Sequence, residues 1–186
     1  MTTKSLKYFL VLATYSFILI SSEAEHEKAK PELGLKYILS WPIEKPPSHG
    51  GAVAIEYALA KYFSLAGELG IRWIHFTVAE FTGKTHDEKA LDISVTVIPK
   101  VIIPVVLENA TLVPYVGLPL GISPVNLVNG KNSQGFGFGL IVGMKYYFTE
   151  NWGANFDFGA QADFRSAQPP YILGGLRPSL GLLYSF

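Results

Sequence analysis

One histidine in the chain is spaced like half of a catalytic pair. His75 and Thr77 would lie on one side of an extended segment, where an imidazole base can reach a hydroxyl group. Acyl transfer of the serine type also needs a carboxylate that orients the base. No acidic residue is suitably placed and the hydroxyl belongs to a threonine, so the spacing favours a histidine without a catalytic role.

A second group of ligand-type residues occurs in the stretch GKTHDEK, where His86, Asp87 and Glu88 are consecutive. Imidazole and carboxylate groups bind cations, but consecutive residues rarely converge on one ion without further ligands. A solvated, charged loop is therefore favoured over a cation site, and we expect no metal and no other cofactor. His49, beside two glycines, fits ordinary turn chemistry.

The composition limits the classes of protein to consider. The 186 residues suffice for one domain, and the absence of cysteine excludes a disulfide framework, a thiolate metal site and a cysteine nucleophile. Lysine plus arginine equals aspartate plus glutamate, at 15 each, so no nucleic-acid partner is expected. Charged residues make up 16% of the chain, against about 25% in soluble domains, which suggests that part of the surface does not face water.

The first residues have the layout of a secretory signal peptide. Lys4 and Lys7 precede an apolar run of 13 residues at 8–20, and residues 22–24 form a small-x-small cleavage site. A membrane-anchoring helix is the alternative, but the run is shorter than the roughly 20 residues that span a bilayer as a helix. We predict a signal peptide at 1–24, a short periplasmic tail at 25–32 and one domain at 33–186.

The segment NWGANFDFGAQADFR, at 151–165, alternates between two kinds of residue. Trp152, Phe156, Phe158 and Phe164 share one parity, and glycines and charged residues share the other. A period of two places these sets on opposite faces of a β-strand. Strands in soluble sheets usually have about 5 to 6 residues, so this length indicates a tilted membrane strand.

The segment 135–148 repeats this pattern, with aromatic residues on one parity and glycines on the other. The glycine face must be a crowded interior, because a soluble sandwich would place polar residues outside rather than glycines. The aromatic face would then contact lipid. Continuing the parity predicts eight strands, at approximately 33–40, 51–60, 64–76, 93–106, 112–122, 135–148, 152–165 and 176–186.

The connections between these strands alternate in length. Short turns are expected near 61–63, 107–111 and 149–151. Long loops are expected at 41–50, 77–92, 123–134 and 166–175. Short periplasmic turns and long outer loops are typical of an outer-membrane barrel with an even number of strands. Both chain ends would then lie on the periplasmic side.

A helix over 52–72 is the alternative for one region, because alanine and leucine are frequent there. However, the stretch EYALAKYFSLAGELG, from Glu56, aligns without gaps to KYYFTENWGANFDFG, from Lys145. Both stretches match in tyrosine, a turn, an acidic residue and a final glycine. The repeat favours two similar hairpins over a helix.

Four prolines fall inside the predicted strands: Pro99, Pro104, Pro114 and Pro119. Each removes a hydrogen-bond donor from the ladder. We therefore expect bulges or strand ends at these positions.

Parity also predicts a charged interior. Nine charged residues would point inward: Lys36, Glu56, Glu68, Arg72, Lys100, Lys145, Asp157, Asp163 and Arg165. Charges removed from water need partners, so we predict a network of ion pairs and hydrogen bonds. Side chains fill the interior of an eight-stranded barrel, which favours a structural plug; a gated small pore or a proton path is the alternative.

The three tryptophans, Trp41, Trp73 and Trp152, lie near the ends of predicted strands, as do several tyrosines. Such residues form aromatic girdles at the two interfaces of a membrane barrel. An aromatic core is the alternative. His75, on the lipid-facing parity near the outer rim, would be an interfacial histidine.

The terminal octet SLGLLYSF has a polar-x-Gly-x-x-aromatic-x-aromatic pattern, carried by Ser179, Gly181, Tyr184 and Phe186. It resembles the C-terminal assembly signal recognised by the outer-membrane insertion machinery. The stretches VTVIPKVIIPV, VPYVGLPLG and GMKYYFTENW resemble strands of the small OmpA-like and OmpX-like barrels of the porin family. In VPYVGLPLG a proline replaces the small residue usual in that family, which affects the strand geometry expected there.

This resemblance implies an exported, eight-stranded antiparallel, up-and-down transmembrane β-barrel in the outer membrane. The expected function is non-enzymatic: envelope structure, or surface interaction and adhesion through four extracellular loops on a charge-plugged scaffold. Expected partners are outer-membrane lipid and lipopolysaccharide, the insertion machinery during assembly, and an extracellular ligand or host surface. The alternatives are a lipid-modifying enzyme, a narrow channel and a soluble, lipocalin-like periplasmic binder.

Overall fold

The computed structural model of the chain describes residues 31–42, 47–79, 85–103, 105–107, 110–128, 131–132, 134–166 and 171–186. The signal peptide predicted at 1–24 and most of the tail predicted at 25–32 lie outside these ranges and stay predictions. Within the described ranges, no helix is long and apolar enough to cross a membrane.

The described residues form one antiparallel sheet of twelve strands. The strands are β1 (Glu32–Pro42), β2 (Ser48–Ala60), β3 (Phe63–Ala79), β4 (Thr85–Ile102), β5 (Val105–Leu107), β6 (Ala110–Gly117), β7 (Leu120–Val128), β8 (Lys131–Asn132), β9 (Gly135–Tyr147), β10 (Trp152–Arg165), β11 (Tyr171–Leu176) and β12 (Ser179–Ser185). The strand reading of residues 52–72 is confirmed, because this segment lies in β2 and β3 and the turn between them.

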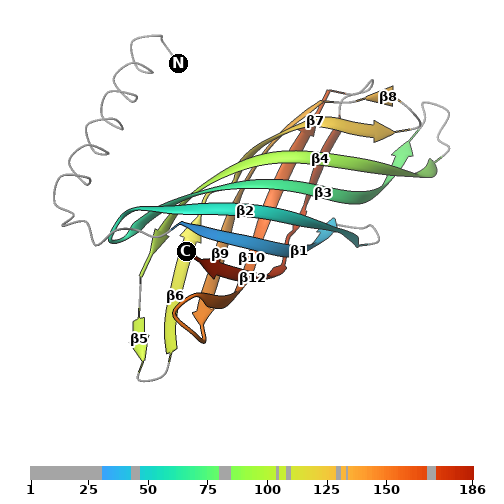
Figure 1. Cartoon of the computed structure of the whole chain (residues 1–186). Helices are drawn as coiled ribbons and strands as arrows, with labels where there is room; N and C mark the ends of the chain where they lie inside the picture. The colour runs from blue at the N-terminus through green and yellow to red at the C-terminus, as the bar shows by residue number, and fades with distance from the viewer. Residues whose placement is uncertain are drawn as a thin grey trace, which may run out of the picture.

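The sheet closes on itself as a barrel (Figure 1). Strands β1 to β4 pair in sequence order, β6 and β7 both pair with β4 and β9, β9 pairs with β10, and β12 returns to β1. Six wall strands are continuous, and two consist of two pieces each, β6 with β7 and β11 with β12. The predicted eight-stranded, up-and-down architecture is confirmed.

The two divided strands are interrupted at X-Pro steps. The first gap contains Leu118 and Pro119, and the second contains Arg177 and Pro178. Proline cannot donate to a ladder, yet both prolines still accept hydrogen bonds: Pro119 O from Gly139 N at 3.0 Å, and Pro178 O from Leu39 N at 2.9 Å. The two divided strands therefore remain hydrogen-bonded to their neighbours across these steps.

The proline predictions have mixed outcomes. Pro119 does mark a strand end, and Pro104 lies outside the described residues. For Pro99 and Pro114 the expectation of bulges or ends was wrong, because both lie inside strands, β4 and β6. The Pro99 carbonyl accepts from Leu118 N at 3.0 Å, so the missing Pro99 donor faces the gap between β6 and β7, where fewer ladder bonds are made.

The two register shifts do not occur at these four prolines. The β2–β3 register shifts between Ala58 and Ala60, and the β4–β7 register shifts between Ile93 and Val95. Each shift adds one residue on one strand, as a β-bulge does. In the second shift the added residue is on β7, where Ser123 and Pro124 lie opposite Ser94 of β4, so this bulge contains a proline.

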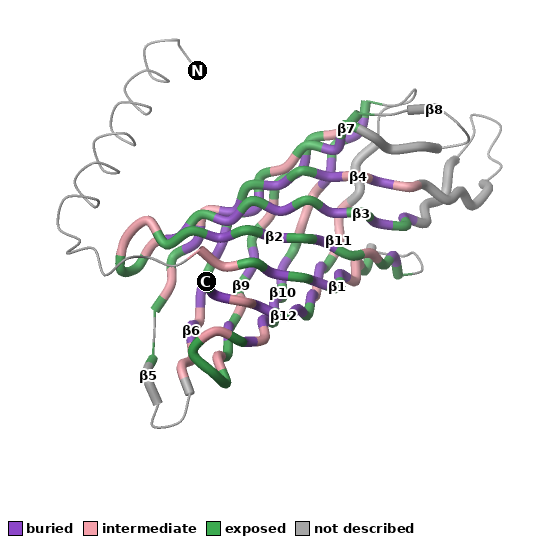
Figure 2. The backbone as a smooth tube through the Cα atoms, in the orientation of Figure 1, coloured by how far each residue is buried: buried purple, intermediate pink, exposed green. Residues whose placement is uncertain are grey.

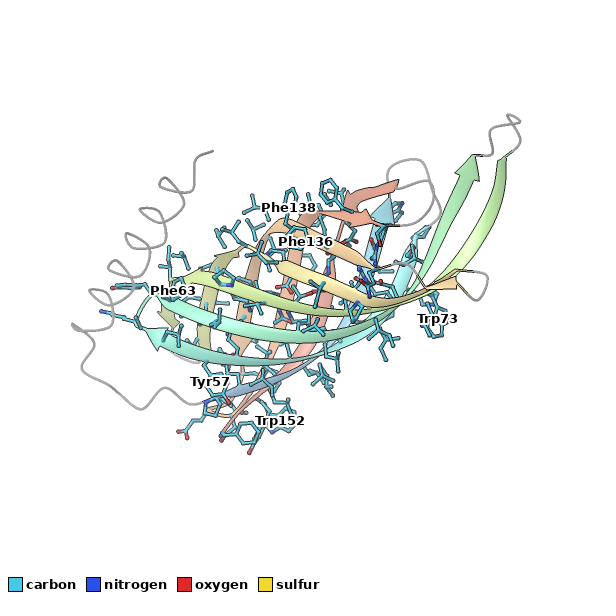
Figure 3. The ribbon with its side chains drawn as sticks, turned by 90° about the horizontal axis from the view of Figure 1, so that it is seen from above. Tyr57, Phe63, Trp73, Phe136, Phe138 and Trp152 are labelled. Atoms are coloured by element: carbon cyan, nitrogen blue, oxygen red, sulfur yellow. The ribbon has the colours of Figure 1, made fainter. Side chains whose placement is uncertain are left out.

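At the loop end the strands continue well beyond their predicted limits. The loop expected at 77–92 was wrong in extent: β3 reaches Ala79 and β4 begins at Thr85, and their pairing continues to that last pair. The resulting hairpin projects past the rest of the wall (Figure 3). Likewise, β7 and β8 occupy most of the loop expected at 123–134, and β11 begins inside the loop expected at 166–175.

The opposite end carries a smaller extension. The strand expected at 93–106 ends at Ile102, and the following β5 pairs only with β6 in a short hairpin that extends past this end of the barrel (Figure 1). The turn expected at 107–111 is correspondingly shorter, since β6 begins at Ala110. We refer to this end, where the C-terminus also lies, as the turn end.

Burial alternates along the wall strands, as Figure 2 shows. In β12 the inward residues are all buried and the outward Leu180 and Leu182 are exposed. Large apolar side chains account for much of the described outer surface. Inside, Ala66, Ile98, Tyr115 and Ile141 form a small apolar cluster, and a few other apolar side chains, such as Ile38 and Leu183, are also buried. An exposed apolar wall around a polar interior fits lipid outside and internal pairing inside.

Candidate functional site

The interior of the barrel is a continuous polar network, and it is the candidate functional site. Every second residue of each wall strand points inward, so the pleat itself brings charged residues from distant parts of the chain together. The network has three groups, which we call the turn-end, central and loop-end groups. They follow one another along the barrel.

The turn-end group is centred on Glu56, from β2. Its carboxylate accepts hydrogen bonds from Lys100 Nζ at 2.5 Å, Lys145 Nζ at 2.7 Å and Ser64 Oγ at 2.6 Å. Lys145 also donates to Glu32, at 2.6 Å. The Lys100 ammonium lies 4.4 Å from the centre of the Tyr115 ring, a cation–π geometry.

The same group extends to the mouth through Tyr147. Its hydroxyl donates to Glu32 Oε1 at 2.5 Å. A pocket of about 290 Å³ lies at this mouth, with Glu32, Lys145 and Tyr147 in its lining. The turn-end group therefore closes the barrel directly behind a shallow vestibule.

The central group links β1 to β10 and β3, the second strands on either side of it. Lys36 Nζ lies 3.0 Å from Asp157 Oδ2 and 3.2 Å from Glu68 Oε2, so one ammonium bridges two carboxylates. Glu68 is also paired with Arg177 Nη2. Each of these four side chains is almost completely buried.

Neutral side chains complete the central group. Ser179 Oγ donates to Asp157 at 2.8 Å, and Asn155 Nδ2 donates to Asp157 and to the Tyr115 hydroxyl, each at 2.9 Å. Arg177 Nη1 donates to Gln161 at 3.1 Å. These bonds pair further donors and acceptors of the buried network, although Asn155 Oδ1 accepts no hydrogen bond.

The loop-end group consists of two arginines between two aspartates. Arg72 donates from Nε and Nη2 to Asp92 Oδ2, at 3.2 and 2.7 Å, and its Nη2 lies 3.4 Å from Asp163. Arg165 Nη1 lies 3.0 Å from Asp92 Oδ1, and Arg165 Nη2 lies 3.9 Å from Asp163. Asp163 also accepts from Gln161 Nε2 at 2.7 Å.

All nine charged residues predicted to point inward lie in this network. Three more were missed: Glu32, Asp92 and Arg177. Among the described residues, the network then holds six cations and six carboxylates: Lys36, Arg72, Lys100, Lys145, Arg165 and Arg177 against Glu32, Glu56, Glu68, Asp92, Asp157 and Asp163. The lumen of the described barrel is therefore formally neutral.

The three missed residues share a pattern that the sequence contains, the parity of the inward face. Glu32 was assigned to the tail, Asp92 to a loop, and Arg177 precedes a proline at the start of the last predicted strand. Each continues the inward parity of the adjoining strand: Glu32 with Gly34 and Lys36, Asp92 with Ser94, and Arg177 with Ser179. Extending parity past the apolar stretch would have found all three.

Little free space remains between these side chains. Two interior cavities have volumes of about 10 and 20 Å³, one among the turn-end and central residues and one beside Arg72 and Asp163. A cavity needs roughly 10–15 Å³ to hold a single water molecule. These two cavities are therefore at most water-sized.

The predicted assembly-signal residues have distinct positions in the closing strand. Ser179 and Gly181 point inward, and a Cβ at Gly181 would lie 2.5 Å from Leu35 O, so the close approach of β1 requires glycine there. Tyr184 and Phe186 point outward, and their rings lie 5.1 Å apart. The Phe186 amide donates to Pro31 O at 3.1 Å, which brings the C-terminus to the start of β1.

The three tryptophans lie on the outer surface, each about half exposed. Trp41 and Trp73 lie toward the loop end and Trp152 toward the turn end, and Figure 3 shows Trp73 and Trp152 pointing away from the barrel. Trp152 packs against Tyr184 with ring centres 5.0 Å apart. The alternative of an aromatic core does not agree with this exposure.

The structure gives the strands of the residues first considered for chemistry, but only some of their side chains. His86, Asp87 and Glu88 lie in β4 rather than a loop, and His75 lies in β3, but their side chains are outside the described ones. His49 belongs to β2 rather than a turn, and its side chain is exposed on the outer wall. In the described part of the chain, no three His, Cys, Asp or Glu side chains converge as a metal site would require.

Comparisons with known proteins match the fold but not the sequence. No protein-family model matches the chain, and no curated protein matches it. Among solved structures, Neisserial surface protein A superposes with a TM-score of 0.62 at 10% identity, covering 84% of this chain and 97% of that one.

Two further outer-membrane proteins give similar values. OprG from Pseudomonas aeruginosa has a TM-score of 0.60 at 12% identity, covering 88% of this chain and 99% of that one. Outer membrane protein W from E. coli has a TM-score of 0.54 at 11% identity, covering 87% and 100%. The chain thus has the fold of the small eight-stranded outer-membrane barrels.

Proposed function

We propose that the protein is a closed, non-enzymatic barrel of the outer membrane that presents its loop end for surface interaction. The observation that carries this proposal is the neutral network that crosses the lumen from wall to wall. In this proposal, the network acts as a structural plug and keeps the barrel rigid. Envelope structure is then a role of the wall, and interaction is a role of the loops.

The positions of the ion pairs support a plug over a pore. Lys36 of β1 pairs with Asp157 of β10 and with Glu68 of β3, and Lys145 of β9 pairs with Glu56 of β2. The Lys145–Glu56 pair joins strands on opposite sides of the ring, and the Lys36 pairs join β1 to the second strand on each side. An ion moving through would have to separate several buried pairs, each costly to break.

The β3–β4 hairpin supports a surface role. It is the longest paired segment of the barrel, with seventeen residue pairs from Phe63 and Val101 to Ala79 and Thr85. Its far part projects beyond the rest of the wall (Figure 3). A rigid scaffold that carries a projecting segment is a common arrangement for binding.

The proposed partners follow from these surfaces. The outer wall would contact outer-membrane lipid and lipopolysaccharide. The C-terminal strand, with Tyr184 and Phe186, would be recognised by the insertion machinery. The loop end would contact an extracellular ligand or a host surface.

Conductance in a planar lipid bilayer tests the plug. The refolded protein should give no discrete current steps, whereas steps at moderate voltage would contradict a closed lumen. A variant that combines Lys36→Ala and Asp157→Ala is the positive control, because it removes both ion pairs of Lys36 and leaves Glu68 with Arg177. This variant should conduct, which would show that the assay detects an opened lumen.

Shortening the hairpin tests the surface role. Phe76 and Glu88 are paired, so a two-residue turn can join them and replace residues 77–87. Cells displaying this variant should bind immobilised extracellular-matrix proteins less than cells displaying the native barrel. Replacing the turn at 149–151 with another turn is the control at the opposite end. Equal binding by all three would contradict adhesion through the hairpin.

A further inference from the structure

A groove on the outer wall has no part in the function proposed above. It lies across β12, β1, β2 and β3 and has a volume of about 850 Å³. Sites for small molecules have volumes of roughly 300–1,000 Å³. The groove is lined mainly by outward-facing apolar residues, so it opens to the membrane rather than to the lumen.

The centre of the groove is Gly51, in β2. The strand register places Gly51 between Tyr37 of β1 and Ile71 of β3, and Leu180 of β12 is the partner of Tyr37 on its other side. Tyr37, Ile71 and Leu180 are about half exposed and form the sides of the groove. The floor of the groove is therefore at Gly51, where β2 has no outward side chain.

The fold does not require glycine at this position. A Cβ at Gly51 would meet only Lys36 O, at 3.6 Å, which is an ordinary contact. The adjacent Gly50 differs, because a Cβ there would lie 2.2 Å from Ile71 O. Packing within the barrel thus explains Gly50 but leaves Gly51 unexplained.

One end of the groove is polar. His49, two residues before Gly51 and on the same face, is opposite Trp73 of β3, and both belong to the lining. Toward the other end, Val53 and Leu69 continue the apolar lining to the middle of the wall. The groove therefore runs from an amphipathic pair near the loop end into the apolar belt.

We propose that this groove binds one acyl chain of a membrane lipid, with the polar end of the lipid beside His49 and Trp73. The bilayer surrounds the groove, so it supplies the ligand directly. Lipid tails are as apolar as the wall, so retention must come from close packing in a shaped surface, which the groove provides and the convex wall does not. A second copy of the barrel would fit poorly, because its convex wall cannot fill a groove. This inference rests on the membrane-spanning fold and not on the surface role.

Filling the groove tests the proposal. Gly51→Leu places a side chain in open space on the floor of the groove. Native mass spectrometry of the refolded protein in detergent, titrated with palmitoyl-oleoyl phosphatidylglycerol, should show a one-to-one lipid adduct of the native chain. In Gly51→Leu, the fraction carrying the lipid should fall by about tenfold, because the packing contacts of the chain are lost.

The chain offers a matched control in Gly67, in β3. Gly67 is also exposed on the outer wall, a Cβ there would meet nothing within 4 Å, and it is outside the groove. Gly67→Leu should bind lipid as the native chain does. Both variants should still show the change in gel mobility on heating that is typical of a folded barrel. This result would exclude misfolding as the cause of any loss of lipid binding.

Three results would overturn the proposal. One is equal lipid retention by the native chain, Gly51→Leu and Gly67→Leu. Another is the absence of a one-to-one adduct of the native chain. The third is a protein dimer that carries no lipid and that Gly51→Leu abolishes, which would assign the groove to a second copy.

Discussion

The inward and outward residues of β2 are determined by different requirements, although they share one backbone. Its inward residues include Gly50, which the neighbouring backbone requires, and Glu56, which holds two lysines. Its outward residues, such as Val53 and Ile55, are about half exposed and face the surrounding medium. Inward positions are thus determined by particular partners, and outward positions mainly by the polarity of the medium.

The largest effect should come from an inward substitution that leaves charges unpaired. Glu56→Gln keeps the shape of the side chain but removes the partner of Lys100 and one partner of Lys145. Because breaking a buried pair costs about 3–5 kcal/mol, the free energy of unfolding should fall by that amount. Guanidinium unfolding in lipid vesicles measures it.

Glu32→Gln is the comparison for this variant. Glu32 pairs with the same Lys145, but its side chain is partly exposed at the mouth. The free energy of unfolding should therefore fall clearly less in Glu32→Gln than in Glu56→Gln. Equal losses would show that burial does not govern these pairs.

A charge on the outer face should have the next largest effect. Leu140 lies near the middle of β9 and is 51% exposed. Because a lipid-facing arginine near the midplane of the membrane costs about 2–4 kcal/mol, Leu140→Arg should destabilise the barrel by that amount. The same unfolding measurement in vesicles applies, and an unchanged stability would indicate that this face does not contact lipid.

Deleting Phe186 should have a smaller effect on stability than on assembly. The deletion removes one backbone hydrogen bond, to Pro31, and an exposed ring. The free energy of unfolding in detergent should therefore fall by only about 1 kcal/mol. Insertion in cells, measured as the heat-modifiable fraction in the membrane, should fall far more.

Phe186→Tyr is the control, because it keeps an aromatic residue at the terminus and should assemble normally. Normal assembly of the deleted chain would contradict recognition of the terminus by the insertion machinery.

The smallest effect should come from an apolar exchange on the outer face. Val142 is 50% exposed in β9. Val142→Leu changes its shape but not its polarity, so the free energy of unfolding should change by less than about 0.5 kcal/mol. A loss of 2 kcal/mol or more by the same measurement, on the order of a core substitution, would show that the outer face is also fitted to particular partners.

The sequence predicted the barrel because lipid imposes a period of two on the outer face. This alternation is no longer visible beyond the membrane, although the strands continue there. Asp92 and the far part of the β3–β4 hairpin, at 77–92, were therefore assigned to a loop, and Glu32 to a tail. The nine inward charges that were predicted all lie within the apolar stretches, where the alternation is visible.

The proline-containing strands could not be placed from the sequence for a different reason. A proline is tolerated where its missing donor faces a neighbour that is itself interrupted, as Pro99 faces the gap beside Pro119. That condition depends on which strand lies alongside, and a single strand pattern does not contain it. The gap at Pro178 was likewise absent from the predicted last strand.

The seam between β12 and β1 joins the last strand of the chain to the first, with seven residue pairs. Lys36 and Asp157 are 121 positions apart, and Glu32 and Lys145 are 113 apart, so neither pair can form until the ring has nearly closed. Interactions that form after the transition state slow unfolding without speeding folding. The charged lumen would therefore lower the rate of unfolding and so lengthen the lifetime of the folded barrel, with little effect on the rate of folding.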